Sequence, residues 1–231
     1  MPILTPTAAT GARTVPAEMT YVNPANLMPP DEAKAFLADT GLNGPFVADL
    51  LSDMLAHERC GAQLYRSLAQ RTNNPMLRKQ YEHFGTETTE HVEVLENLID
   101  QLGGDPNYVS PAARATTKAG TGLLESTFLL TGSIDLMTQE LVMLDAVLLA
   151  EAKDHANWGC LAALAEGMPT GDIRDAFTNA VDQVLPQEDD HFGWVSETRC
   201  KLVSAQATSR AAQVVGEAAE TVVSRIKKWL D

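Results

Sequence analysis

The sequence predicts an all-α protein, a four-helix bundle made of two antiparallel hairpins joined by a long crossover connection. Apolar residues recur at three- and four-residue spacing through four long stretches. Two tight turns, TNNP at 72–75 and GMPTG at 167–171, pair these stretches into hairpins. A connector of about 30 residues joins the pairs, which favours a crossover over a simple up-and-down bundle.

The predicted domains are an N-terminal arm with a short helix (1–44), the bundle (45–205) and a C-terminal amphipathic helix (206–231). Residues 1–30 are rich in Pro, Thr and Ala with little periodicity, so we expect an extended arm, and 31–40 predicts the short helix. The final segment has one apolar side, which consists of Val215, Val222, Ile226 and Trp229.

The bundle helices are bounded by turn signals. The first runs from Pro45 to the TNNP turn, and the second runs from about 75 to 102, where GGDP ends it. The connector is polar over 105–121 and then predicted helical through LLESTFLL, with a break at Gly132-Ser133. The third and fourth helices are expected at 134–167 and 172–205, and Pro186 predicts a kink in the fourth.

The composition of the chain limits which partners, cellular location and cysteine chemistry we expect. The 231 residues include 31 Asp and Glu against 17 Lys and Arg, so neither nucleic acid nor an anionic membrane is expected as a main partner. The N-terminus lacks a secretory pattern, and acidic residues interrupt the most apolar stretch, so we expect a cytoplasmic protein. The three cysteines form no CxxC pair, which excludes a rubredoxin-type iron site or zinc ribbon; we expect reduced, mostly buried thiols.

The pattern that suggests a functional site occurs in both hairpins. In each, the first helix carries a glutamate and the second helix carries a glutamate–histidine pair. Both pairs have spacings, three or four residues, that keep the two side chains on one helix face. Apolar residues share that face, so these groups are predicted to point inward. The candidate metal ligands are Glu58, Glu87, His91, Glu151, Glu188 and His191.

Counting residues from the turns tests whether these groups lie at one height. Glu151 lies 16 residues before Gly167, and Glu188 lies 16 residues after Asp172, so the two are level in the second hairpin. In the first hairpin, the position level with Glu58 is residue 89, between the glutamate and the histidine of the pair. Glu140, the competing carboxylate, lies three turns too far from its loop. We therefore select Glu151.

Buried carboxylates without nearby Lys or Arg repel one another and must take up protons or bind cations. Oxygen and imidazole ligands suit iron, manganese or zinc. A single Glu/His pair in so acidic a chain is often coincidence, but two pairs, each level with a glutamate on the neighbouring helix, favour a two-metal site.

The stretches LAHERCGAQLYRSLA, FGTETTEHVEVLENLIDQLGGDP and LPQEDDHFGWVSETRCKL resemble the metal-bearing helices of the ferritin-like superfamily, which includes bacterioferritin, rubrerythrin and manganese catalase. The resemblance covers about 45–205 and selects no subfamily. It implies a ferritin-like bundle with two iron ions (or manganese) that handles dioxygen or peroxide. Glu188 and His191 match the ExxH pattern, whereas Thr88 stands where the other ExxH needs glutamate, and Glu87 or Glu90 would substitute.

Three hypotheses follow for function. The first is a di-iron or di-manganese oxidoreductase of peroxidase, catalase or oxygenase type, supplied by an external electron donor where its reaction needs one. The second is a non-catalytic ferritin-like binding or structural protein with a degenerate metal site. The third is a storage cage, although the long arm and the structured connector favour a small homo-oligomer, preferably a dimer. No individual catalytic residue is assigned, and His155, one turn from Glu151, is expected beside the site rather than as a ligand.

Overall fold

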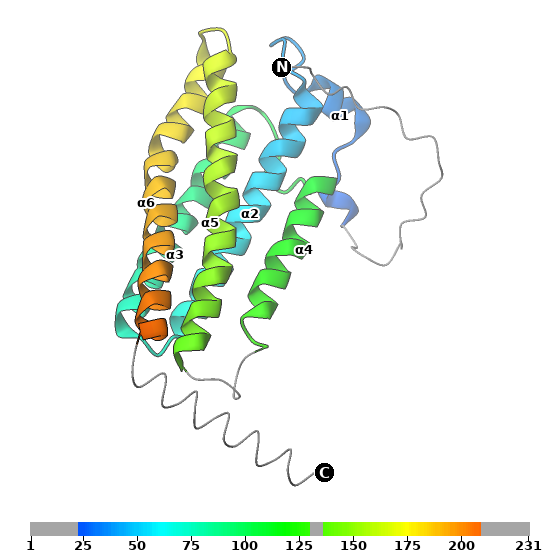
Figure 1. The fold of residues 1–231 in the computed structure, drawn as a ribbon. Helices are drawn as coiled ribbons and strands as arrows, with labels where there is room; N and C mark the ends of the chain where they lie inside the picture. The colour runs from blue at the N-terminus through cyan, green and yellow to red at the C-terminus, as the bar shows by residue number, and fades with distance from the viewer. Residues whose placement is uncertain (1–22, 130–135, 209–231) are drawn as a thin grey trace, which may run out of the picture.

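The computed structural model describes residues 23–129 and 136–208, and within these ranges all regular structure is helical. The elements are a 3-10 turn (Pro24–Asn26), α1 (Pro30–Ala35), α2 (Gly44–Arg71), α3 (Pro75–Gln101), α4 (Pro111–Ser126), α5 (Leu136–Gly167) and α6 (Asp172–Thr208). Two antiparallel hairpins, α2–α3 and α5–α6, form the bundle, and α4 lies beside α2 on the crossover (Figure 1). The predicted all-α four-helix bundle with a long crossover is confirmed.

Capped turns start α2, α3 and α4. The side chains of Asn43, Asn74 and Ser110 accept hydrogen bonds from backbone N–H groups in the first turn of the helix that each precedes. A proline at the first or second position of each helix fixes φ where no N–H partner is needed. These local signals set where each helix begins, and so fix the height of every residue along it.

The structure corrects three predicted boundaries. α4 begins at Pro111, inside the stretch predicted only as polar, because the Ser110 cap starts a helix and α4 packs against α2. α1 ends at Ala35 rather than at 40. α6 runs unbroken through Pro186 and past 205 to Thr208. The Gly132-Ser133 break, the arm over 1–22 and the C-terminal helix beyond 208 lie outside the described residues.

The apolar core is divided into two clusters along the bundle axis. Cluster A lies towards the α5–α6 turn and includes Leu51, Leu55, Leu95, Trp158, Phe177 and Val184. Cluster B lies towards the α2–α3 turn and includes Leu64, Tyr65, Phe84, Leu144, Val147 and Val195. Each bundle helix contributes residues to both clusters. Between the clusters, about halfway along the bundle, lies a buried layer that neither apolar cluster fills.

The cysteine prediction is partly wrong. All three thiols are free, but Cys60 is only half-buried. Cys160 and Cys200 are exposed, because they lie on the outer faces of α5 and α6.

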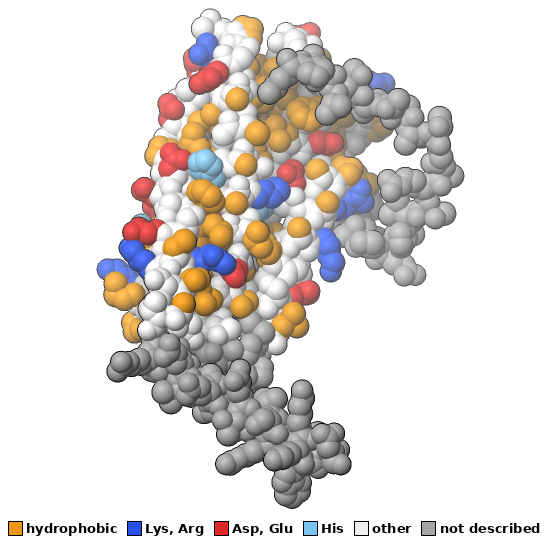
Figure 2. Space-filling model, viewed as in Figure 1, with side chains coloured by type: hydrophobic (Ala, Val, Ile, Leu, Met, Phe, Trp, Pro, Cys, Tyr) orange, Lys and Arg blue, Asp and Glu red, His pale blue; other side chains and the backbone are white. Residues whose placement is uncertain are grey.

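Figure 2 shows one side of the molecule, on which hydrophobic side chains lie among charged ones along the helices. In the part of the chain that the structure describes, no helix is both long and apolar enough to cross a membrane.

Leu144→Ala is expected to lower the free energy of unfolding by about 2–5 kcal/mol, because the fully buried Leu144 side chain packs in cluster B. The matched control is Leu149→Ala on the same helix, where the side chain is exposed and the change should stay within about 0.5 kcal/mol. Urea denaturation measures both, and equal effects would contradict this description of the core.

Candidate metal centre

A layer of buried ionisable side chains separates the two apolar clusters. α2 contributes Glu58, α3 contributes His91, and α5 contributes Glu151; α6 contributes Glu188 and His191. None of the five is more than 3 % exposed. Each lies between a residue of cluster A and a residue of cluster B on its own helix, so the four helices bring their polar groups to one height.

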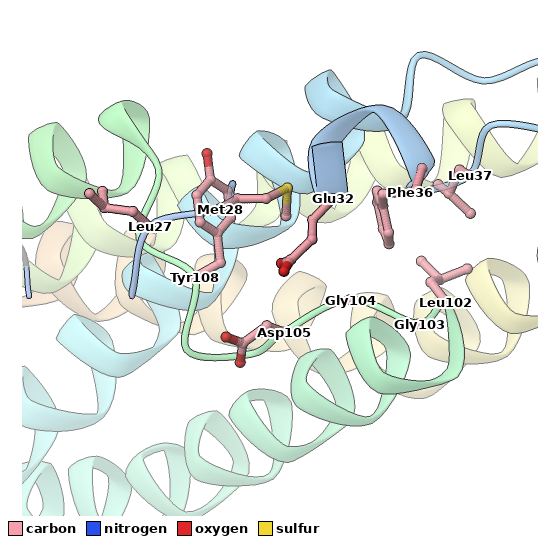
Figure 3. Close-up of a pocket in the computed structure, with 11 residues that line it drawn as sticks. Leu27, Met28, Glu32, Phe36, Leu37, Leu102, Gly103, Gly104, Asp105 and Tyr108 are labelled. Atoms are coloured by element: carbon pink, nitrogen blue, oxygen red, sulfur yellow. The ribbon is translucent and has the colours of Figure 1, made fainter. Parts of the chain in front are cut away.

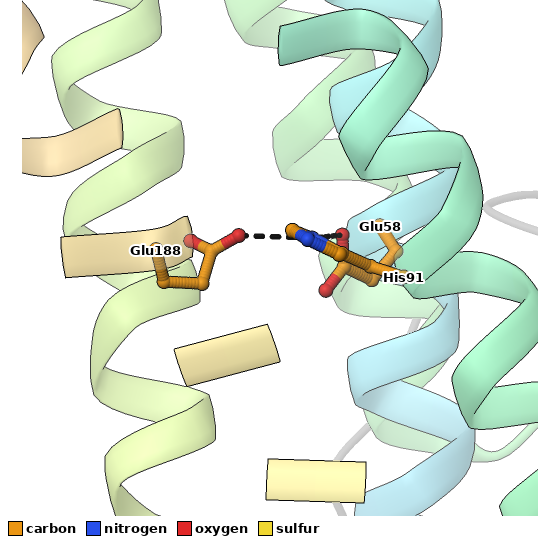
Figure 4. Close-up of side chains that lie close together, drawn as sticks. All are labelled: Glu58, His91 and Glu188. Carbon is orange, nitrogen blue, oxygen red and sulfur yellow. Dashed lines mark ion pairs between the residues drawn. The ribbon is translucent and has the colours of Figure 1, made fainter. Parts of the chain in front are cut away.

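The first group of potential ligands consists of Glu58, His91 and Glu188 (Figure 4). The Nδ1 atom of His91 lies 3.0 Å from Oε1 of Glu188 and 3.6 Å from Oε2 of Glu58. Figure 4 shows Glu188 reaching across the bundle from α6 towards the other two side chains. The three thus converge from three different helices.

The second group consists of Glu151, Glu188 and His191. The Nδ1 atom of His191 lies 3.4 Å from Oε2 of Glu151 and 3.6 Å from Oε1 of Glu188. Within each group, the potential ligand atoms lie within 4.8 Å of one another, and Glu188 belongs to both groups. The structure therefore brings together five of the six side chains selected from the sequence.

The atoms that face this layer meet only one another and have no hydrogen-bond partner outside it. They are Oε2 of Glu58, Nδ1 of His91, Oε2 of Glu151, both carboxylate oxygens of Glu188 and Nδ1 of His191. Buried polar atoms are rarely left without a partner, and these are the donor types that bind iron, manganese and zinc. The residues present therefore fit a pair of cations, and the two groups that share Glu188 could hold two metal ions.

The carboxylate oxygens of Glu58 and Glu151 that point away from the layer accept hydrogen bonds from aromatic side chains. The Trp158 indole donates to Oε1 of Glu58, and the Tyr65 hydroxyl donates to Oε1 of Glu151, each at 2.7 Å. Such contacts leave the second oxygen of each carboxylate directed into the layer. The sequence could not identify these two contacts, because the pattern of a single helix does not show which carboxylate an aromatic donor on another helix meets.

Each histidine is also oriented through its outer nitrogen. Nε2 of His91 lies 2.7 Å from the amide oxygen of Gln187, and Nε2 of His191 lies 2.9 Å from Oε2 of Glu87. Partners of this kind fix the tautomer and the ring orientation of a metal-binding histidine. In both rings, the partner leaves Nδ1 facing the layer.

The α3 candidates are arranged differently from the predicted ligand set. Glu87 is outside both groups and contacts the outer nitrogen of His191, while Glu90 is exposed. Thr88 is buried and donates its hydroxyl hydrogen to the Phe84 carbonyl. It fits there because α2 approaches closely at Gly61, where an added Cβ would lie 3.3 Å from the Thr88 methyl.

The remaining candidates lie away from the layer. His155 is not beside the site as expected; it is partly exposed and pairs with Asp189 at 2.7 Å. Glu140 accepts hydrogen bonds from Thr72 and Asn73 at the α2–α3 turn, which confirms that it lies too far from the α5–α6 turn to reach the layer. Its carboxylate holds the turn rather than the centre.

Asp154 is the site residue that sequence reasoning missed. It lies three residues after Glu151 on α5, is 4 % exposed and has an unpartnered Oδ1. Burial, and then the nearby Glu58 carboxylate, raise the pKa of Asp154 well above its ordinary value. The E-x-x-D spacing on a buried face is the signal that could have found it.

Protons compensate the buried carboxylates when no cation does. Burial opposes protonation of His91, but the carboxylates of Glu188 and Glu58 outweigh it and raise the pKa of His91 to about 10. Glu151 and Glu188 likewise raise the pKa of His191 against the effect of burial. Burial raises the pKa of Glu188 to about 7, against the effect of His91. A metal ion would therefore displace protons from the layer.

A separate cavity of about 370 Å³ lies at the far side of cluster A, between α1 and the end of α3 (Figure 3). Its walls combine apolar side chains such as Met28 and Phe36 with two carboxylates, Glu32 and Asp105. No group of three potential metal ligands is found there among the described residues. The layer between the clusters is thus the better candidate site.

Comparison with known proteins places these helices in a family. The model of the domain of unknown function DUF892 matches residues 46–208. The crystal structure of the E. coli stress protein YciF is similar, with a TM-score of 0.56 and 20 % identity over 68 % of this chain and 94 % of that one. At that identity, the likeness supports the fold alone. No curated protein matches the chain.

Metal-free protein is expected to lose thermal stability as pH rises from about 5 to 10. The pKa of His91 is raised to about 10 and that of Glu188 to about 7, so the folded state holds both protons more tightly than the unfolded state. The stability they add is complete at low pH and is lost as pH rises through these values. Scanning calorimetry after chelation measures the slope, which should be shallower in Glu188→Gln; equal slopes would contradict the assignment.

Proposed function

The chain belongs to the DUF892 family, and we propose that it is an oxidoreductase that acts on dioxygen or peroxide at a dinuclear iron or manganese centre. The single observation that carries this proposal is the buried Glu188 carboxylate: its Oε1 lies 3.0 Å from Nδ1 of His91 and 3.6 Å from Nδ1 of His191, and neither of its oxygens has a hydrogen-bond partner outside the layer. A carboxylate with both oxygens free suits a bridge between two cations. A residue present only for packing would not leave both oxygens unsatisfied.

In the proposed centre, Glu58 and His91 would hold one ion, Glu151 and His191 would hold the other, and Glu188 would serve both. Three protein ligands on each ion leave positions open, as in catalytic rather than structural metal sites. When bound, iron or manganese would supply the change of oxidation state that reduction of dioxygen or peroxide requires.

The protein's own residues would prepare and protect this centre. Trp158 and Tyr65 hold one oxygen of each terminal carboxylate, so that the other oxygen faces the ions. Glu87 accepts a hydrogen bond from the Nε2–H group of His191 and so keeps Nδ1 available. Clusters A and B exclude bulk water from both sides of the layer, and with ligands at most 3 % exposed, the site favours molecules as small as dioxygen or peroxide.

Electrons would come from an external donor, or from a disproportionation that needs none, because no CxxC pair is present to bind a rubredoxin-type iron. We also propose a homo-oligomeric state, preferably a dimer, which light scattering of the purified protein would test.

The second candidate is a binding or structural protein with a degenerate centre, and Thr88 is the observation that favours it. Since Thr88 occupies the position of the α3 ExxH glutamate, the layer has three glutamates, Glu58, Glu151 and Glu188, rather than four. This alternative predicts metal-independent stability and no reaction with dioxygen or peroxide.

Wild-type protein is expected to bind two iron or manganese ions per chain, and Glu188→Gln should weaken both sites by about 10–100-fold or more, because one carboxylate serves both ions. Glu58→Gln should weaken one site only. Anaerobic titration followed by elemental analysis measures both. Asp190→Asn, an exposed neighbour on α6, is the matched control and should bind like wild type. Retention of two tightly bound ions by Glu188→Gln would sink the bridging assignment.

Protein loaded anaerobically with ferrous iron is expected to show a rapid absorbance change on mixing with dioxygen or hydrogen peroxide, and the change should be lost in His191→Asn. Stopped-flow spectroscopy measures the rate for each oxidant, and the Asp190→Asn control should match wild type. Two bound ions without any reaction would remove the oxidoreductase and leave a metal-binding role; no bound ions would remove both and support the alternative with a degenerate centre.

A further inference from the structure

One end of the bundle carries exposed apolar side chains. α2, α4 and α6 end there, and α3 and α5 begin there (Figure 1). Leu129 is 81 % exposed and Leu136 is 56 % exposed, and they are accompanied by other large exposed side chains from helix ends. We define the apolar end surface by Met76, Leu129, Leu136, Met137 and Val203.

Antiparallel pairing brings these side chains to one end. Arg199 of α6 pairs with Asp145 of α5, and because the two helices run in opposite directions, the first turn of α5 lies level with the last turns of α6. Leu136 and Met137 therefore lie at the height of Val203 and beyond.

The α2–α3 turn joins the same surface. Glu140, one turn into α5, accepts hydrogen bonds from the hydroxyl of Thr72 and the backbone N–H of Asn73. Met76, in the first turn of α3, therefore belongs to the same end of the molecule. Concentrated apolar exposure on a soluble helical bundle indicates a surface that something covers.

The chain itself continues from this place. The structure describes α6 as far as Thr208, beside the apolar end surface, and the family match also reaches 208, so residues 209–231 lie outside the matched domain. After Gly216, the sequence has an apolar stripe at helical spacing, with polar residues between its members. The stripe consists of Ala219, Val222, Val223, Ile226, Trp229 and Leu230.

The length of the segment suits the span. A helix over 217–231 would be about 22 Å long at 1.5 Å per residue, which is close to the width of two packed helices, about 20 Å. Residues 209–216 are enough to reverse the chain direction at a few ångströms per residue.

We propose that the C-terminal segment 209–231 docks its apolar stripe onto the apolar end surface of its own chain. The tether at Thr208 favours this occupant, because it gives the segment a high effective concentration that a second copy would lack. An anionic lipid surface is disfavoured by the net charge of −14. Docking covers cluster B at the end of the bundle that the crossover and the α2–α3 turn leave apolar.

Cross-linking of the full-length chain tests the contact. In a background with Cys60, Cys160 and Cys200 replaced by Ser, Leu136→Cys is combined with Ile226→Cys and treated with a short bis-maleimide. The product should be an internally linked monomer, seen by intact mass and gel mobility. The matched control, Ser224→Cys, lies on the opposite face of the same segment and should react at least about tenfold more slowly with Leu136→Cys.

Thermodynamic coupling supplies a second measurement that does not depend on linker geometry. Leu136→Ser and Ile226→Ser should each lower the melting temperature, and the double variant should lower it less than additively, because either change removes the same contact. Leu149→Ser, exposed elsewhere on α5, should combine additively with Ile226→Ser.

Linked dimers would overturn the proposal and identify a second copy as the occupant. Equal cross-linking rates at 224 and 226, or additive effects of Leu136→Ser and Ile226→Ser, would also overturn it, since a free or lipid-bound segment gives those results.

Discussion

The structure depends on five ionisable side chains that are buried in one layer between two apolar clusters. Charges in such a place cannot be hydrated, so each must be neutralised by a proton, a partner or a cation. In the metal-free chain the two histidines neutralise the carboxylates, because the carboxylates raise the pKa of both rings against the effect of burial. The arrangement opposes stability unless something binds, and this makes it a functional feature rather than a packing one.

Keeping that layer closed requires the four helices to hold one register. The hairpin turns set the height of every side chain, and the Asn74 cap and the Glu140 contacts to Thr72 and Asn73 fix the α2–α3 turn. A shift of one residue on any helix would rotate its ligand by about 100° out of the layer. Structural residues far from the centre therefore determine its geometry.

Much of this could be predicted from the sequence, because helical periodicity and distance from a turn are both local quantities. Counting selected Glu151 over Glu140, and the face rule found His91 and His191. What could not be predicted depends on neighbouring helices: the aromatic donor to each terminal carboxylate, the burial of Asp154 beside the ligands and the outward direction of Glu87. The start of α4 was missed because a cap outweighed polar composition.

The sequence indicates that the two halves of the candidate centre differ, because Thr88 replaces a glutamate. The structure shows a second difference, in the residues that contact the two histidines from outside the layer. His191 is backed by the Glu87 carboxylate, whereas His91 is backed by the neutral amide of Gln187. A carboxylate partner makes an imidazole a stronger donor and stabilises a more highly charged ion. Under the proposed function, Glu87 would therefore help Glu151 and His191 to hold their ion more tightly than Glu58 and His91 would hold theirs.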